Sequence, residues 1–271
     1  MPKLASNYAE TLRRMSSLEV LFINSYDELA SLPNEGFQLL TSLKTLGIDY
    51  CPKLSFSTME SSLGGLPSSL ESFNLSSSPH IGGSFFTGMH SLVSLQLFSV
   101  SDCPMLTSFP KEGVKNLIHL QTLSISNCAN LEALPTGLRG LSTLETFDIE
   151  YCPQITCLPE EKLPASLHRL SVNGCPELKE RCCKEGGQDW PKIEHIPFVI
   201  LDGEFEDLNE EKFAHFYSLG NANETNAGRK NLWIEGESRT TVSWVLGKGN
   251  LPWTAIRILK DIHHKLGYLA D

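Results

Sequence analysis

The residues of this chain with the clearest chemical potential are its eight cysteines. Thiolates and imidazoles bind zinc, but the spacing of Cys175, Cys182, Cys183 and His195 matches no standard zinc pairing. A structural role is favoured over disulfides because five cysteines share one position of a repeated pattern: Cys51, Cys103, Cys128, Cys152 and Cys175. We therefore expect no catalytic residue, no metal site and no cofactor.

The repeated pattern begins with Leu, followed three positions later by a large apolar residue and two further on by a β-branched residue or Leu. Usually Cys follows after three positions, and Leu or Ile after three more. The clearest copy is Leu43, Leu46, Ile48, Cys51 and Leu54. Seven copies start 23 to 27 residues apart, at Leu18, Leu43, Leu70, Leu95, Leu120, Leu144 and Leu167. A period of about 20–29 residues with this pattern is typical of leucine-rich repeats, and therefore of a solenoid.

Each copy predicts a short strand and a return leg. The two central apolar positions are two residues apart, which is the period of a strand with one buried face. Cys-Pro follows in four copies and ends the strand, because proline has no N–H for a ladder. The return legs carry Leu-Pro or Phe-Pro, so we expect irregular or 3₁₀ segments with one-turn helices, as near Val114–Ile118. The predicted fold class is α/β: a leucine-rich repeat solenoid with a parallel sheet on its concave face, plus a small C-terminal αβ fragment.

Stacking should align equivalent residues about 4.8 Å apart. The cysteines then form a ladder of small buried side chains whose S–H groups donate to turn backbone. Stacking is needed because one repeat cannot bury enough apolar surface alone. No N-terminal cap is evident, so we expect Leu18, Leu21 and Ile23 to expose an unpaired strand edge, as in a piece of a longer array.

The strand residues that alternate with the buried ones line the concave face. Asp148, Glu150 and Tyr151 form one acidic and aromatic cluster there, and Asp49 with Tyr50 forms another. Polar residues on a strand are ordinarily only solvated, but as a set these favour a basic protein partner. The candidate partner-binding residues are Glu19, Phe22, Lys44, Asp49, Tyr50, Glu71, Gln96, Asp102, Gln121, Glu145, Asp148, Glu150, Tyr151 and Arg169.

The net charge of −10 argues against nucleic acid and against an anionic membrane surface as partners. No apolar run approaches the roughly 20 residues of a spanning helix. The first fifteen residues show no apolar core of a secretory signal. We therefore expect a cytoplasmic protein, in which thiols stay reduced.

A more specific block follows the last repeat: Cys175-Pro176, Arg181-Cys182, Asp189-Trp190-Pro191-Lys192-Ile193 and His195-Ile196-Pro197. With the repeats, it resembles the C-terminal end of the leucine-rich region of plant nucleotide-binding disease-resistance receptors, most closely the coiled-coil class. The resemblance covers about residues 15–197. It implies a non-catalytic defence module that binds a pathogen effector or a host protein and restrains an N-terminal nucleotide-binding domain. That domain is absent from this chain, because no G-x-x-x-x-G-K-[ST] phosphate loop is present.

The composition changes after residue 197. Residues 202–211 hold six carboxylates, and residues 218–230 are rich in Asn and Gly. The predicted domains are therefore a solenoid of about seven repeats with a C-terminal cap at 1–197, an acidic and polar linker at 198–230, and a separate segment at 231–271. Within that segment we expect a strand at Asn231–Ser238 and helices beginning at Val242 and at Pro252.

Residues 232–238 (Leu-Trp-Ile-Glu-Gly-Glu-Ser), Val242-Ser-Trp244 and Pro252-Trp253 resemble a stretch of plant ribonuclease H-like domains related to retroelements. That family holds two metal ions with four carboxylates, and Glu237 is the one acid that corresponds here. The segment 231–271 is therefore interpreted as a partial ribonuclease H-like remnant. A nucleic-acid-binding or nuclease remnant, and a truncated product without function, remain as alternatives to the binding module.

Overall fold

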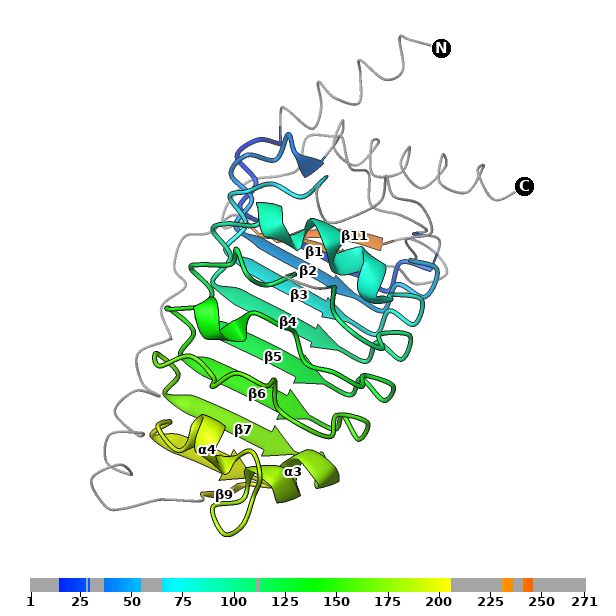
Figure 1. Cartoon of the computed structure of the whole chain (residues 1–271). Helices are drawn as coiled ribbons and strands as arrows, with labels where there is room; N and C mark the ends of the chain where they lie inside the picture. The colour runs from blue at the N-terminus through cyan, green and yellow to red at the C-terminus, as the bar shows by residue number, and fades with distance from the viewer. Residues whose placement is uncertain are drawn as a thin grey trace.

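The computed structural model describes residues 15–27, 29, 37–54, 65–110 and 113–205, together with the backbone of strands at 231–235 and 241–245. Eight parallel strands lie side by side in chain order within one open sheet (Figure 1). They are β1 (Val20–Asn24), β2 (Thr45–Asp49), β3 (Ser72–Ser76), β4 (Leu97–Ser101), β5 (Thr122–Ser126), β6 (Thr146–Glu150), β7 (Arg169–Asn173) and β8 (Phe198–Leu201). The α/β leucine-rich repeat solenoid predicted from the spacing is thus confirmed.

The predicted inward residues form continuous rows across the sheet. Ile48 pairs in register with Leu75, Ile125 pairs with Ile149, and Ile149 pairs with Val172. These side chains are at most 1% exposed. The copy at Leu70, which has Ser78 at the Cys position, is buried as completely as the others. The spacing therefore identified the core correctly, because each strand places its alternate residues in one shared interior.

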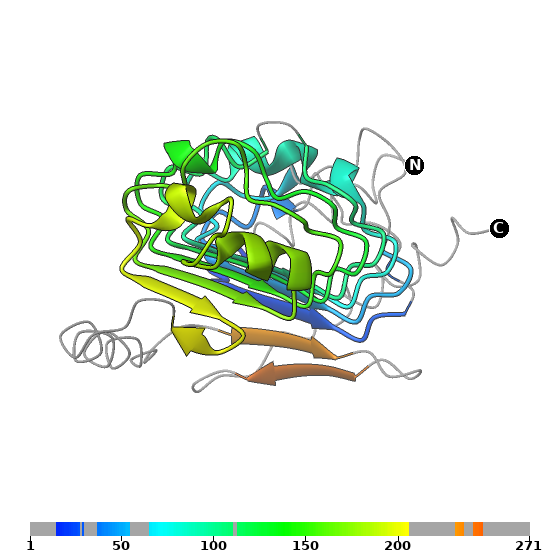
Figure 2. The same cartoon turned by 60° about the horizontal axis from the view of Figure 1, so that its bottom comes forward.

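The return legs form the wall opposite the sheet, and they carry the 3₁₀ helices η3 (Gly83–Ser91) and η4 (Leu138–Gly140) (Figure 2). The one-turn helix expected near Val114–Ile118 is wrong. That segment forms turns, in which the Leu117 N–H donates to the Val114 carbonyl at 3.0 Å. The longer η3 has room for Phe85 and Phe86, whose ring centroids lie 4.9 Å apart in an edge-to-face contact.

The sheet extends beyond residue 197. After α3 (Pro176–Cys182) and α4 (Trp190–Ile193), β8 continues the parallel order, and β9 (Glu204–Phe205) pairs with it antiparallel. The first part of the expected linker is therefore sheet, because the four residues of β8 are all apolar and buried. The rest of that linker, residues 206–230, lies outside the described residues.

The other edge of the sheet is also paired. β10 (Asn231–Glu235) lies parallel to β1, and β11 (Thr241–Val245) lies antiparallel to β10 (Figure 1). The unpaired edge expected at β1 is therefore wrong, as is the helix expected from Val242. Thr, Val and Trp in that segment favour a strand. The strand expected at Asn231–Ser238 is present over 231–235, while the helix expected from Pro252 lies outside the described residues.

Candidate protein-binding surface

Each of the strands β1 to β8 is followed by a residue with a left-handed backbone, which turns the chain away from the sheet. The φ angle is 54° at Tyr50, 52° at Asp102 and 51° at Tyr151. This conformation costs a residue with a side chain about 1 kcal/mol, so the neighbouring repeat must hold it in place. The N–H of Tyr151 donates to the Asn173 carbonyl at 2.8 Å, and the N–H of Asp102 donates to the Ser126 carbonyl at 3.1 Å. The turn directs the next residue inward and leaves both tyrosines at the rim, with Tyr50 61% and Tyr151 59% exposed.

The cysteine ladder lies directly behind these turns. The Sγ of Cys103 donates to the Ser101 carbonyl at 3.3 Å, and Cys128 and Cys152 repeat the contact at 3.4 and 3.3 Å. In the copy with serine, the Ser78 Oγ makes the same bond to the Ser76 carbonyl at 3.0 Å. The predicted role of the cysteines as S–H donors to turn backbone is confirmed.

The buried thiols are poor nucleophiles and poor metal ligands. Burial raises the pKa of Cys51 to about 11 and that of Cys103 and Cys182 to about 12. These groups are therefore protonated at neutral pH. None of the eight cysteines forms a disulfide. Within the described ranges, no three His, Cys, Asp or Glu side chains lie close enough to share a metal ion.

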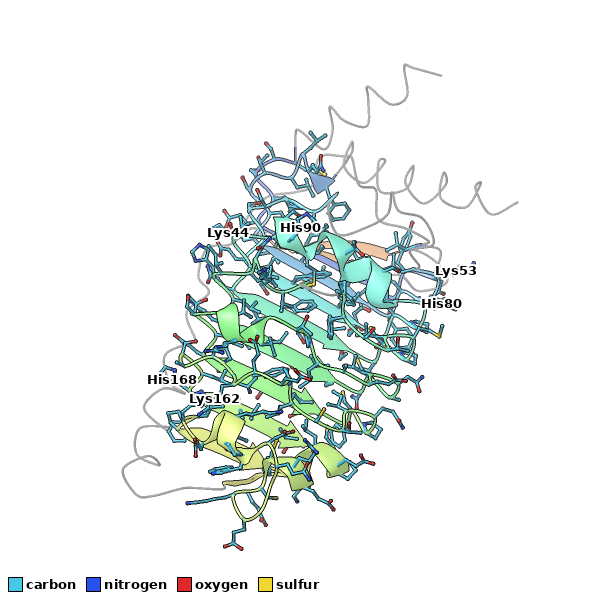
Figure 3. The ribbon with its side chains drawn as sticks, in the orientation of Figure 1. Lys44, Lys53, His80, His90, Lys162 and His168 are labelled. Carbon is cyan, nitrogen blue, oxygen red and sulfur yellow. The ribbon has the colours of Figure 1, made fainter. Side chains whose placement is uncertain are left out.

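The candidate binding residues lie within the strands of the sheet, directly before them or directly after them. Figure 3 shows Lys44 and His168 on the side of the molecule where the strands begin, and Lys53 and His80 on the side where the strands end. The candidates that precede a strand are Glu19, Lys44, Glu71, Gln96, Gln121 and Glu145; those that lie within a strand are Phe22, Asp49, Asp148, Glu150 and Arg169; those that follow a strand are Tyr50, Asp102 and Tyr151.

The cluster around Asp148 links β6 to β7. Asp148 Oδ1 lies 3.4 Å from Arg169 Nη2, and the Asn173 amide donates to Glu150 Oε1 at 3.2 Å. The Asp148 side chain is 19% exposed. Burial raises the pKa of Asp148, Arg169 opposes that shift, and Glu150 adds to it. The charged form of Asp148 is therefore disfavoured mainly by its partial burial, and the nearby Arg169 partly compensates for that burial.

Two glycines support aromatic rings on this surface. The Tyr151 ring lies against Gly174, where a Cβ would come within 2.5 Å of the ring Cδ1. The Phe22 ring covers Gly47 in the same way, so that a side chain at position 47 would overlap it. Gly174 also has a positive φ of 62°. Sequence reasoning missed Gly174. The usable signal was a glycine at the position where the other repeats have Ser, Tyr, Asp or Asn.

The cluster around Asp49 is smaller and links β2 to β3. The Ser76 hydroxyl donates to Asp49 Oδ1, and Lys44 Nζ lies 3.2 Å from Glu71 Oε1. Both partners of this ion pair are partly exposed, so it contributes at most about 1 kcal/mol to stability. The ion pair neutralises the charges of Lys44 and Glu71. Asp49 keeps its charge and lies next to the exposed Tyr50 in the sequence.

The block that follows the last repeat forms an ion network away from this surface. The Asp189 side chain is 1% exposed and accepts hydrogen bonds from Arg181 Nε at 3.0 Å and from Arg181 Nη2 at 3.1 Å. Lys192 Nζ lies 2.8 Å from Asp189 Oδ1, and the Leu158 N–H donates to Asp189 Oδ2 at 2.9 Å. Asp189 therefore ties α3 and α4 to the return leg of the sixth repeat.

Residues 3–129 match the family described as "Plant disease resistance protein RPS2-like, leucine-rich repeats". A 28-residue stretch is 64% identical to the "Putative disease resistance protein RGA4" of Solanum bulbocastanum. This chain is similar to the leucine-rich repeat region of plant disease resistance proteins.

The similarity to RGA4 covers 10% of this chain and 3% of that protein, so the chain matches only a small part of its relative. The range that matches the family, 3–129, does not include residues 231–271. The resemblance of that segment to ribonuclease H-like domains stays a prediction. Among the residues that the structure describes, no helix is long and apolar enough to cross a membrane.

Proposed function

We propose that this chain is a recognition module of the plant immune-receptor type, which binds a protein partner across the concave face and catalyses no reaction itself. The partner is a pathogen effector or a host protein. In a complete receptor of this type the module also contacts a nucleotide-binding domain and works in the cytoplasm. The single observation that carries the proposal is the cluster of Asp148, Glu150 and Tyr151 at the end of β6, where Arg169 and Asn173 of β7 hold the two carboxylates.

The chemistry of the surface favours a basic partner. The candidate residues include seven carboxylates and two cations, Lys44 and Arg169. Each cation is already paired with an acid, at Glu71 and at Asp148. The remaining carboxylates leave a negative field that speeds association with a positive surface. Tyr50, which follows β2, and Tyr151, which follows β6, add large exposed rings to this surface. Tyrosine is enriched among the residues that dominate binding energy.

Affinity purification from plant tissue with the full chain as bait tests the proposal. The informative bait is Glu150→Lys with Tyr151→Ala, and the matched control is Glu132→Lys, which reverses a carboxylate on a return leg. We expect at least one protein to be retained by the wild type and by the control, and reduced at least tenfold with the double variant. Identical sets of proteins on all three baits would refute a binding role for this face.

A further inference from the structure

The five residues of β10 repeat the strand pattern of the solenoid. In the observed register, Leu21 pairs with Leu232 and Ile23 pairs with Ile234. The same rows continue into β2 through Leu46 and Ile48. Asn231–Glu235 therefore carries the Leu-x-Ile spacing of a repeat strand, in phase with every strand behind it, although it is separated from β1 by two hundred residues of sequence.

The site that β10 occupies is the side of β1 where a solenoid would continue. A strand at the end of a parallel sheet presents unpaired N–H and C=O groups and the open end of the apolar core. Leu21 is 5% exposed and Ile23 is 8% exposed, close to the 0% and 1% of Leu46 and Ile48 in the next repeat. The end of the core is thus covered almost as well as its interior.

The chain is long enough to make this connection. β9 and β10 are nine strand positions apart in the sheet, which corresponds to about 43 Å at 4.8 Å per strand. Residues 206–230, which join β9 to β10, can span up to about 80 Å when extended. A parallel arrangement also requires a crossover connection of a dozen or more residues, and this segment exceeds that length.

We propose that residues 231–235 act as a surrogate repeat strand, which the chain places on its own β1 edge. The edge of β1 is then a strand-acceptor site for an extended Leu-x-Ile segment that runs parallel to it, an intramolecular form of β-strand addition. Any other strand with this spacing, including that of a preceding repeat or of a second copy, must displace residues 231–235 to reach the site.

A cross-linking experiment on the full chain tests the register. Asn24 pairs with Glu235 across the β1–β10 boundary, so Asn24→Cys with Glu235→Cys places two Cα atoms about 4.8 Å apart, within disulfide range. The matched control is Asn24→Cys with Thr241→Cys. Thr241 pairs with Glu235 from β11, so it lies two strands from Asn24, about 9.6 Å away. Both pairs are made with Cys157→Ser, which removes the exposed native cysteine.

After mild oxidation, peptide mass spectrometry should show at least ten times more 24–235 disulfide than 24–241 disulfide, and size-exclusion chromatography should show that the linked chain is a monomer. Equal yields from the two pairs would overturn the proposal, as would no 24–235 link. A 24–235 link found only in dimers would identify a second copy as the occupant, and would also overturn it.

Hydrogen exchange provides an independent measurement. In the full chain, Leu232→Asp with Ile234→Asp places charges at the two inward register positions, while Glu235→Gln serves as the control. We expect exchange of the β1 amides to become at least tenfold faster in the double variant and to stay unchanged in the control, with β5 unaffected in both. Unchanged exchange of β1 in the double variant would contradict the proposal.

Discussion

Replacing Asp189 should destabilise the C-terminal cap more than any other change to a charged residue described above. Its carboxylate is 1% exposed and receives hydrogen bonds from Arg181, Lys192 and the Leu158 N–H. Removing one partner from a buried ion pair costs about 3–5 kcal/mol. Arg181 is 35% and Lys192 21% exposed, so both recover some hydration when the acid is lost. This hydration reduces the ion-pair contribution to about 2 kcal/mol. The orphaned Leu158 N–H adds about 1–3 kcal/mol, so we expect Asp189→Ala to cost about 3–5 kcal/mol in total.

Urea denaturation of the full chain measures this cost, and hydrogen exchange locates it. In a solenoid, each repeat contacts mainly its neighbours, so α3, α4 and β8 should exchange faster in Asp189→Ala while β3 and β4 keep their protection. Glu194→Ala is the matched control, because its ion pair with Lys162 is more than half exposed on both sides. A cost below about 0.5 kcal/mol, or a loss of protection spread evenly along the sheet, would refute the argument.

The same carboxylate predicts a pH dependence. Burial raises the pKa of Asp189, but the hydrogen bonds from Arg181, Lys192 and Leu158 outweigh burial and hold the pKa below its ordinary value. A lowered pKa in the folded state means that the stabilisation is present above the unfolded pKa of about 3.9 and is lost as the pH falls through the folded value. The stability difference between wild type and Asp189→Asn should therefore shrink below about pH 4, and a difference that stays constant to pH 2 would contradict this cause.

Three further predictions concern the ladder, the turns and catalysis. Cys128→Ser should cost little, because Ser78 already fills the equivalent position. Cys128→Val removes the thiol donor and leaves the Ser126 carbonyl with the Asp102 N–H alone, so it should cost about 1 kcal/mol; equal urea midpoints for the two variants would contradict this. Gly174→Ala should lower the free energy of unfolding by about 1 kcal/mol because of its positive φ, and its new Cβ should displace the Tyr151 ring. In a Tyr151→Ala background the ring is absent, so Gly174→Ala should still cost the backbone part. If Gly174→Ala cost nothing in that background, the ring overlap alone would be responsible. The full chain should not cleave an RNA–DNA hybrid with Mg²⁺, and cleavage that disappears in Glu237→Ala would establish the ribonuclease H-like alternative.

The sequence alone was sufficient for the repeats and the core. Period-two spacing identifies which strand residues are buried, and the 23 to 27 residue period identifies which strands are neighbours. Even the copy at Leu70, which has Ser78 in place of Cys, was correctly placed, because a hydroxyl can donate the same hydrogen bond to the turn. These properties are local, since each repeat meets the same environment as the next one.

Only the tertiary structure decided the contacts that the repeat period does not contain. The ion pair of Asp148 with Arg169 joins diagonal positions on neighbouring strands, and the Tyr151 ring lies on Gly174 because of the left-handed turn. Asp189 reaches the Leu158 N–H across thirty-one residues. Strand β10 pairs with β1 from the far end of the chain, where the sequence had predicted an open edge. The physical reason is that periodicity reports whether a side chain is buried, whereas pairing between distant segments depends on which edges, charges and backbone groups the folded repeats leave unsatisfied.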